Sequence, residues 1–126
     1  YTSEAAQRLL NEAARYLGTP YVWGGYSPSG FDCSGFVSYC LTNSGVRNTG
    51  RLTAQGLYNI CTPVSQSEAQ PGDLIFFTGT YDAGEPVTHI GIYVGNGQMI
   101  HCGHPVQYTS INSQYWQSHF YGFGRW

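Results

Sequence analysis

The stretch of sequence that decides the fold runs from residue 88 to residue 101 and reads THIGIYVGNGQMIH. Apolar residues alternate with polar or small ones on both sides of Gly95-Asn96-Gly97, and such turn residues between two alternating segments indicate a β-hairpin. We therefore expect two antiparallel strands, His89–Val94 and Gln98–Cys102. A three-residue loop with Gly97 in the left-handed position joins them in this interpretation.

The length of this loop decides where the two histidines of the hairpin point. With three loop residues, Gly91 lies opposite His101, so His89 and His101 project from one face as diagonal neighbours about 7–8 Å apart at the backbone. A two-residue loop would place them on opposite faces, because a slip of one residue turns every side chain over. We expect the face of His89, Gly91 and Tyr93 to meet a helix that carries a nucleophile. The plain alternative is a pair of half-exposed surface histidines.

Cys33 is the candidate nucleophile. A helix is expected over Cys33–Leu41 with Asp32 as its N-cap, and unpaired N–H groups and the helix dipole favour a thiolate in the first turn. The N–H of Cys33 is also placed to hold a developing oxyanion. A buried structural cysteine is the alternative interpretation.

The other elements complete an α+β pattern, because helices come first and antiparallel strands follow. Two further helices are expected over Ser3–Leu17, with Ser3 as N-cap and Gly18 as the stop, and in a short segment from Thr53. Three further strands are expected at Asp73–Phe77, Pro105–Thr109 and Phe120–Arg125.

Length and composition limit the class of protein. The 126 residues, 41% of them hydrophobic, suit one domain over residues 1–126, and no apolar run approaches the roughly 18–20 residues of a membrane span. The net charge is −2, and five scattered arginines without any lysine argue against nucleic-acid binding. The chain starts at Tyr1 without a signal-peptide pattern, so we expect any leader, anchor or wall-binding module to lie outside it.

Four cysteines, Cys33, Cys40, Cys61 and Cys102, lack the paired Cys/His spacing of a zinc site. We therefore expect no structural metal. A disulfide involving Cys61 stays open as an alternative to free thiols.

Five motifs in order resemble the NlpC/P60 family: YVWGG at 21–25, FDCSGFV at 31–37, PGDLIFF at 71–77, THIGIYV at 88–94 and MIH at 99–101. The resemblance implies a papain-like α+β fold, with N-terminal helices packed on a five- or six-stranded antiparallel sheet. It implies a secreted or wall-associated thiol peptidase that cuts peptidoglycan stem peptides between D-γ-glutamate and diaminopimelate or Lys. No cofactor is implied, and further wall-binding or lytic modules are expected elsewhere in a longer protein.

The resemblance also assigns roles to residues. Cys33 becomes the nucleophile, His89 the general base and His101 the polar residue that orients His89, acting through a Cys33 thiolate and a His89 imidazolium. Tyr21 shapes the substrate site and donates to the oxyanion. Asp32 and Ser34 bind the free amino end of an L-Ala-D-Glu stem, although Asp32 acting only as a helix cap is an equal alternative.

Two segments depart from the family pattern. Cys102 directly follows His101 and is expected to pack in the core, and the connection Thr78–Val87 is either a lid or a solvated loop. Three rival functions stay open. They are another papain-like chemistry, such as an N-acetylmuramoyl-L-alanine amidase or a transpeptidase, a non-catalytic wall-binding module, and a secreted domain held by disulfides.

Overall fold

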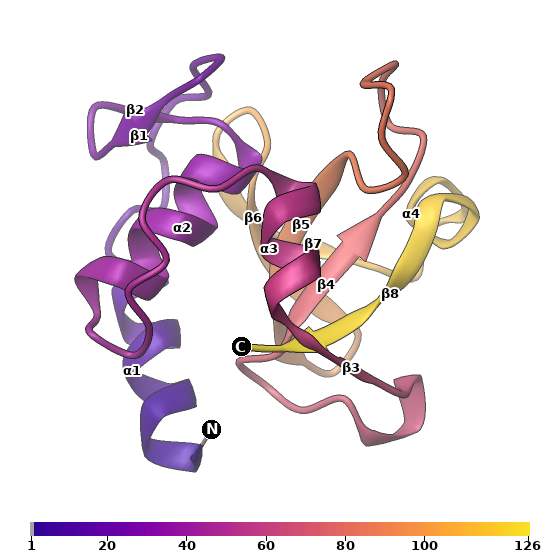
Figure 1. The fold of residues 1–126 in the computed structure, drawn as a ribbon, viewed down its shortest axis with the longest axis horizontal. Helices are drawn as coiled ribbons and strands as arrows, with labels where there is room; N and C mark the ends of the chain where they lie inside the picture. Colours follow the sequence, from indigo (N-terminus) through magenta and orange to yellow (C-terminus); the bar gives the residue numbers. More distant parts are fainter. Residues whose placement is uncertain (1) are drawn as a thin grey trace.

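The computed structural model describes residues 2–126 and shows an α+β fold (Figure 1). The α-helices of the described chain are α1 (Ser3–Ala14), α2 (Cys33–Asn43), α3 (Ala54–Ile60) and α4 (Gln114–His119), and a 3₁₀ turn covers Gln66–Glu68. The strands are β1 (Tyr26–Ser27), β2 (Gly30–Phe31), β3 (Thr62–Val64), β4 (Leu74–Phe77), β5 (His89–Gly95), β6 (Gln98–Cys102), β7 (Val106–Ser110) and β8 (Phe120–Arg125). None of the described helices has the length and apolar character of a bilayer span.

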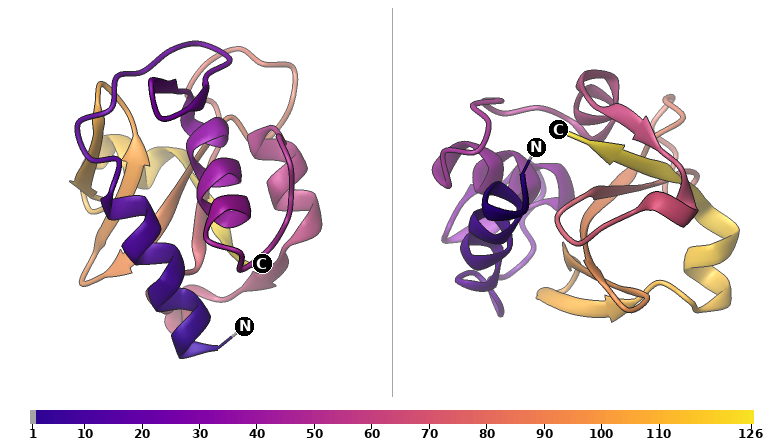
Figure 2. Two further views of the ribbon diagram at one scale, coloured as in Figure 1. Left: turned by 90° about the vertical axis from the view of Figure 1, so that its left-hand side faces the viewer. Right: turned by 90° about the horizontal axis from the view of Figure 1, so that it is seen from below.

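A six-stranded antiparallel sheet forms the centre of the molecule, in the order β3-β8-β4-β5-β6-β7, and β1 and β2 form a separate ribbon. Helices α1, α2 and α3 lie on one side of this sheet, and α4 lies at its other side next to β8 (Figures 1 and 2). The expected fold class is confirmed. Strand β3 and helix α4 were not expected, because both are too short to show a hydrophobic period.

Both faces of the sheet are covered. The larger core packs α1, α2 and α3 against one face, which carries Ile90, Ile92 and Ile100. A smaller core on the other face contains Phe77 and Met99 together with the partly buried Trp116 of α4. All four residues of β4 are buried for this reason.

Helix α2 lies in the larger core, and eight of its eleven residues are buried. Gly35 allows this position, because a Cβ atom there would lie 1.9 Å from the carbonyl oxygen of Gly25. The loop before the helix therefore closes directly on the first turn of α2. The Asp32 side chain accepts from the N–H of Gly35 at 2.6 Å and caps the helix as expected.

The first helix differs at both ends from the expected Ser3–Leu17. Thr2 is its N-cap, in extended conformation, and accepts a hydrogen bond from the N–H of Ala5, whereas Ser3 is already helical. The helix ends at Ala14, and residues 15–18 form a turn that closes with Gly18 at φ +88°. The apolar period continues through this turn, which is why the sequence suggested a longer helix.

The hairpin has the expected register but not the expected loop. Ile92 pairs with Ile100 and Tyr93 with Met99, and this register extended places Gly91 opposite His101. The turn itself consists of Asn96 and Gly97, both at positive φ. A bulge between Tyr93 and Gly95 compensates for the shorter turn, so both histidines still share a face.

Candidate active site

The thiol of Cys33 lies where the N-terminus of α2 meets the start of β5. Its Sγ is 3.9 Å from the carbonyl oxygen of Thr88. The backbone N–H of Ile90 is a hydrogen-bond donor to the sulfur and acts to lower its pKa. Cys33 is therefore held against the backbone on both sides of His89. All four cysteines of the chain have free thiols, so no disulfide occupies this sulfur.

His89 and His101 form a hydrogen-bonded pair on the same face of the sheet. His89 Nε2 lies 2.9 Å from His101 Nδ1, and His101 Nε2 lies 2.9 Å from Thr109 Oγ1 on β7. The Trp116 ring stacks on His89 at 5.2 Å and meets His101 edge-on at 5.4 Å. Gly91 leaves the space for this pair, since a Cβ atom there would lie 3.2 Å from the Cβ atom of His101.

The histidine pair does not face α2, and the expectation that it would is wrong. Ile90 and Ile92 pack in the core with α2, so His89 and Tyr93 project from the opposite face, towards Trp116 and Phe77. The thiol of Cys33 lies beside the backbone of Thr88, directly before His89 at the start of β5. In the described chain the polar partner of the Cys33 thiol is Thr88 and that of the His89 ring is His101.

Burial dominates the acid–base properties of these groups. It lowers the pKa of His89 to about 3, with a smaller contribution from His101, and lowers the pKa of His101 to about 4. Burial, together with the nearby Asp32 carboxylate, raises the pKa of Cys33 to about 11. Burial thus favours the neutral thiol and the neutral imidazoles, and the thiolate–imidazolium pair expected from the sequence stays a prediction.

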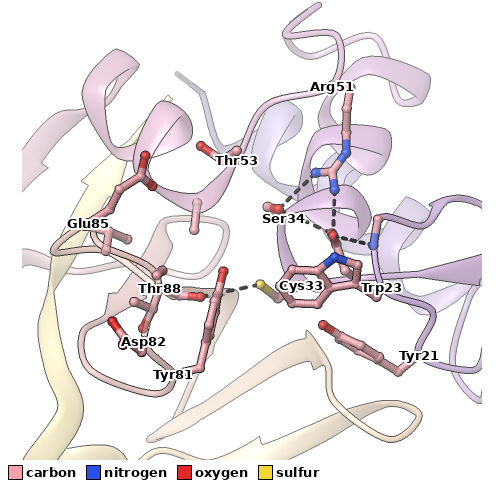
Figure 3. A pocket seen from close by; sticks show the side chains of 15 residues that line it. Tyr21, Trp23, Cys33, Ser34, Arg51, Thr53, Tyr81, Asp82, Glu85 and Thr88 are labelled. Carbon is pink, nitrogen blue, oxygen red and sulfur yellow. Dashed lines mark hydrogen bonds and ion pairs between the residues drawn. The ribbon is translucent and has the colours of Figure 1, made fainter.

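A cleft of about 510 Å³ opens on the other side of Cys33 (Figure 3). Tyr21, Asp32 and Ser34 line it, whereas His89 and His101 do not. The substrate-binding role expected for the first three stays a prediction. Burial and the neighbouring Cys33 raise the pKa of Tyr21 to about 12, so its hydroxyl keeps its proton and remains a donor.

Two exposed aromatic side chains meet across this cleft. Trp23, from the loop after α1, and Tyr81, from the 78–87 connection, are in edge-to-face contact with ring centroids 5.7 Å apart. Figure 3 shows both rings close to the sulfur of Cys33. The connection 78–87 is therefore a wall of the cleft, with Tyr81, Asp82 and Glu85 among the lining residues.

Arg51 joins the side chains on both sides of Cys33. Its Nη2 lies 2.6 Å from Asp32 Oδ2 and its Nη1 lies 2.9 Å from Ser34 Oγ, while Nη1 also donates to the carbonyl oxygen of Leu52 at 2.8 Å. The Asp32 carboxylate accepts further bonds from the N–H of Gly24 and Gly35 and from the Ser34 hydroxyl. In the described residues no group of three His, Cys, Asp or Glu side chains is arranged for a metal ion.

Three residues of the site, Thr109, Arg51 and Trp116, were not expected from the sequence. The pairing of His101 with Gln107 makes Thr109 a diagonal neighbour of His101, so the rule that joined the two histidines would have found it once β7 was in register. Nothing in the sequence links Arg51 to Asp32, because a loop and a helix separate them. Trp116 lies on a helix of six residues that has no readable period.

Comparisons with known proteins agree with this architecture. The family model described as NlpC/P60 family matches residues 18–125. The bifunctional muramidase/DL-endopeptidase CwlT of Bacillus subtilis is 44% identical over 94% of this chain, and the probable endopeptidase p60 of Listeria seeligeri is 48% identical over 93%. This chain spans only 36% and 21% of those two proteins.

A solved structure of an NLP/P60 family protein, similar to lipoprotein, from Staphylococcus aureus superposes with a TM-score of 0.92. It is 42% identical, and the superposition covers 99% of this chain and 42% of that one. Fold, motifs and family model coincide over nearly the whole chain. This chain belongs to the NlpC/P60 family.

Proposed function

We propose that this domain is a cysteine peptidase that hydrolyses the D-γ-glutamyl–diaminopimelate or D-γ-glutamyl–Lys bond of peptidoglycan stem peptides. One observation carries the proposal: a helix-end thiol lies against the strand that bears His89, and the far nitrogen of His89 is bonded to His101. Nucleophile, base and orienting group in this order are the parts of acyl transfer through a thiol. The endopeptidase names of the two relatives support hydrolysis of a peptide bond, and the muramidase name of CwlT supports a cell-wall substrate.

The hydrogen bonds of the histidine pair favour a base at His89 Nδ1. If His101 donates its Nε2–H to Thr109, its Nδ1 accepts the Nε2–H of His89, and the Nδ1 of His89 then carries a lone pair. This nitrogen is able to take the proton of the Cys33 thiol as the sulfur turns from Thr88 towards the ring. Burial lowers the pKa of His89, which keeps the ring neutral at pH 7 but also makes it a weaker base, so the hydrogen bond to His101 has to stabilise the imidazolium that forms.

In the proposed reaction, the Cys33 sulfur attacks the scissile carbonyl carbon while His89 takes the thiol proton. The backbone N–H of Cys33 and the hydroxyl of Tyr21 stabilise the oxyanion. His89 gives its proton to the leaving amine, and an acyl-enzyme remains. Water then adds to the acyl-enzyme, His89 takes one proton from it, and that proton returns to the sulfur as the acid is released.

The setting of the reaction follows from its substrate. Peptidoglycan lies outside the cytoplasmic membrane, so we place the domain in a secreted or wall-associated protein. Because it spans about a third or less of its two relatives, we also propose that wall-binding or lytic modules accompany it in a longer chain. Tyr21, Asp32 and Ser34 belong to the substrate-binding part of the site in this proposal.

Digestion of purified muropeptides tests the proposal. Stems with Lys or diaminopimelate at the third position, with and without the sugar, are incubated with the domain and analysed by mass spectrometry. We expect products that end in D-glutamate, no effect of a chelator, and inactivation by iodoacetamide. A cut between muramic acid and L-Ala would identify an amidase instead, and intact substrates would remove peptidase activity from this domain.

A further inference from the structure

The hydrogen-bonded chain that begins at His89 ends at the edge of the sheet. His89 Nε2 lies 2.9 Å from His101 Nδ1, and His101 Nε2 lies 2.9 Å from the hydroxyl oxygen of Thr109. Thr109 belongs to β7, an edge strand of the six-stranded sheet (Figure 1). Burial lowers the pKa of both histidines and so favours their neutral forms. A neutral ring carries a single N–H, so the chain of hydrogen bonds runs in one of two directions.

The two directions differ in what they leave on His89. In the first direction, His89 donates its Nε2–H to His101, His101 donates its Nε2–H to Thr109, and the Nδ1 of His89 carries a lone pair. In the second direction, the Thr109 hydroxyl donates to His101, which donates its Nδ1–H to His89, and the Nδ1 of His89 then carries a proton. Only the first direction allows His89 to accept the proton of a thiol. The direction of the chain therefore decides whether this ring is a base.

The two ends of the chain favour the first direction. Among the described residues, His89 Nε2 is bonded to His101 and His89 Nδ1 has no hydrogen-bond partner. Folded proteins tolerate an unpaired acceptor lone pair more readily than an unpaired N–H, so the lone pair belongs on this nitrogen. At the other end, Thr109 is half-buried, and its hydroxyl can accept from His101 while its own proton points to water.

The surroundings of His101 leave Thr109 as the acceptor for its Nε2–H. Gln107 lies directly opposite His101 in the strand pairing, but its amide nitrogen donates to the carbonyl oxygen of Pro105 at 3.0 Å. The Trp116 ring meets His101 edge-on at 5.4 Å and covers it. His101 is only 4% exposed, so water has little access to the ring. Without the hydroxyl at position 109, the Nε2–H of this buried ring would lose its acceptor.

We propose that Thr109 is a positioning residue that accepts the Nε2–H of His101 and thereby keeps the Nδ1 of His89 free to act as the base. The inference rests on the proposed function, because it concerns the base of that reaction. Thr109 acts through two imidazoles and does not line the cleft, so its removal should affect kcat and leave KM unchanged. The proposal extends the site to β7, a strand that carries none of the catalytic or substrate-binding residues expected from the sequence.

The test reads the positions of the ring protons directly. Protein labelled with nitrogen-15 in histidine is studied by NMR at pH 7, where a ring nitrogen with a proton is distinguished from one with a lone pair by its chemical shift. Single replacement of His104 and of His119 by Gln identifies the signals of the other two rings. The wild type is compared with Thr109→Val, which removes the hydroxyl, and with Thr109→Ser, which keeps it, and kcat and KM on muropeptides are measured for each. Gln107→Val is the matched control, because Gln107 lies on the same strand and face, is half-buried like Thr109, and is not part of the chain.

In the wild type we expect His89 and His101 both to carry their proton on Nε2. In Thr109→Val the N–H without an acceptor lies on His101 in the first direction and on His89 in the second, and His89 is the more exposed ring. We therefore expect the protons to move largely to Nδ1 in Thr109→Val, and kcat to fall by about 5- to 100-fold, as when a buried polar group loses its partner. Thr109→Ser should restore the wild-type protonation and most of kcat, and Gln107→Val should change neither.

Several outcomes would overturn the role of Thr109. They are a wild-type His101 with its proton on Nδ1, an unchanged protonation or an unchanged kcat in Thr109→Val, and an equal loss of kcat in Gln107→Val. If Thr109→Val does not fold, the wild-type spectrum and Thr109→Ala decide by the same criteria. A wild type with both protons on Nε2 that cleaves no muropeptide would instead contradict the proposed peptidase activity and confirm the direction of the chain.

Discussion

The two sides of Cys33 differ in almost every physical property. On the histidine side (His89, His101, Thr109 and Trp116) the groups are neutral, pack against aromatic rings and satisfy one another through hydrogen bonds. On the cleft side (Tyr21, Trp23, Asp32, Ser34, Arg51, Tyr81, Asp82 and Glu85) the groups are largely polar or charged and line an open space.

This difference shows how one sulfur serves two tasks. Proton transfer needs a base that is neutral at working pH and a partner that stabilises the charge it then gains. Burial keeps His89 and His101 neutral, and the hydrogen bond between the two rings supplies that partner. Substrate binding needs fixed charges that stay exposed to water until the ligand displaces that water. The nucleophile stands at the end of the sheet, where the two environments meet.

Replacing the shared sulfur should have the largest effect. We expect Cys33→Ala to lower kcat/KM on muropeptides by about 10⁴-fold or more, because both sides lose the atom they serve. The fold should survive, since alanine suits the first turn of a helix, and the melting temperature should stay close to that of the wild type. Cys61→Ala, outside both sides of the site, is the control and should retain activity. Substantial lysis by Cys33→Ala would exclude the thiol mechanism.

Breaking the histidine side at His101 should have the next largest effect. His101→Ala removes the acceptor for the Nε2–H of His89, and we expect a loss of about 10²- to 10³-fold in kcat. His101→Asn keeps an acceptor near that position and should lose clearly less. Equal losses in the two variants would indicate that His101 only fills space.

The same side should make the protein sensitive to acid. Both histidines have a folded pKa below the ordinary value of 6.5, so the unfolded chain binds their protons first as the pH falls. Stability is therefore complete above about pH 6.5 and declines towards pH 4, by about 1.4 kcal/mol per pH unit for each histidine. Urea denaturation at pH 7, 6 and 5 measures this slope. A double variant, His89→Gln with His101→Asn, should show a much smaller slope, and an equal slope would assign the sensitivity to other groups.

Exposing the histidine side to water should shift the pH dependence of kcat/KM without abolishing activity. Trp116→Ala exposes the ring of His89, so its pKa rises from about 3 towards 6.5 and the acid limb of kcat/KM moves to higher pH. We expect a loss of several-fold at pH 5 and little change at pH 7.5. Trp23→Ala, on the cleft side, should leave the acid limb where it is. A shift in both variants, or in neither, would contradict the separation of the two sides.

Much of this arrangement was readable from local patterns. The turn residues at 95–97 and the alternation on both sides predicted that His89 and His101 share a face, and the cap at Asp32 predicted the position of Cys33. The strand register is the expected one although the turn has two residues and not three. The bulge at Gly95 supplies the extra residue, so the pairing of the two strands is unchanged.

The rest depended on tertiary structure. Alternation tells which side chains share a face of a strand, but it does not tell which face a helix covers when both faces are apolar. Ile90 and Ile92 pack on the face of the sheet that α2 covers, so the two histidines lie on the opposite face and contact Trp116. The bond between Arg51 and Asp32 joins segments that no periodic pattern connects, and the pKa values of the histidines follow from burial that the sequence alone does not reveal.

The smallest effect is expected on the cleft side, where Tyr81 meets Trp23 near the sulfur. Tyr81→Ala removes this contact, and we expect the rate of alkylation of Cys33 by iodoacetamide to rise by about two- to fivefold, because access to the thiol improves while its proton affinity changes little. Tyr108→Ala is a matched control, since Tyr108 and Tyr81 are both 48% exposed and Tyr108 lies on β7, outside the cleft. Mass spectrometry of the modified Cys33 peptide measures the rate. An unchanged rate in Tyr81→Ala would mean that the two aromatic rings do not restrict the entrance, and that the histidine side alone limits the reactivity of Cys33.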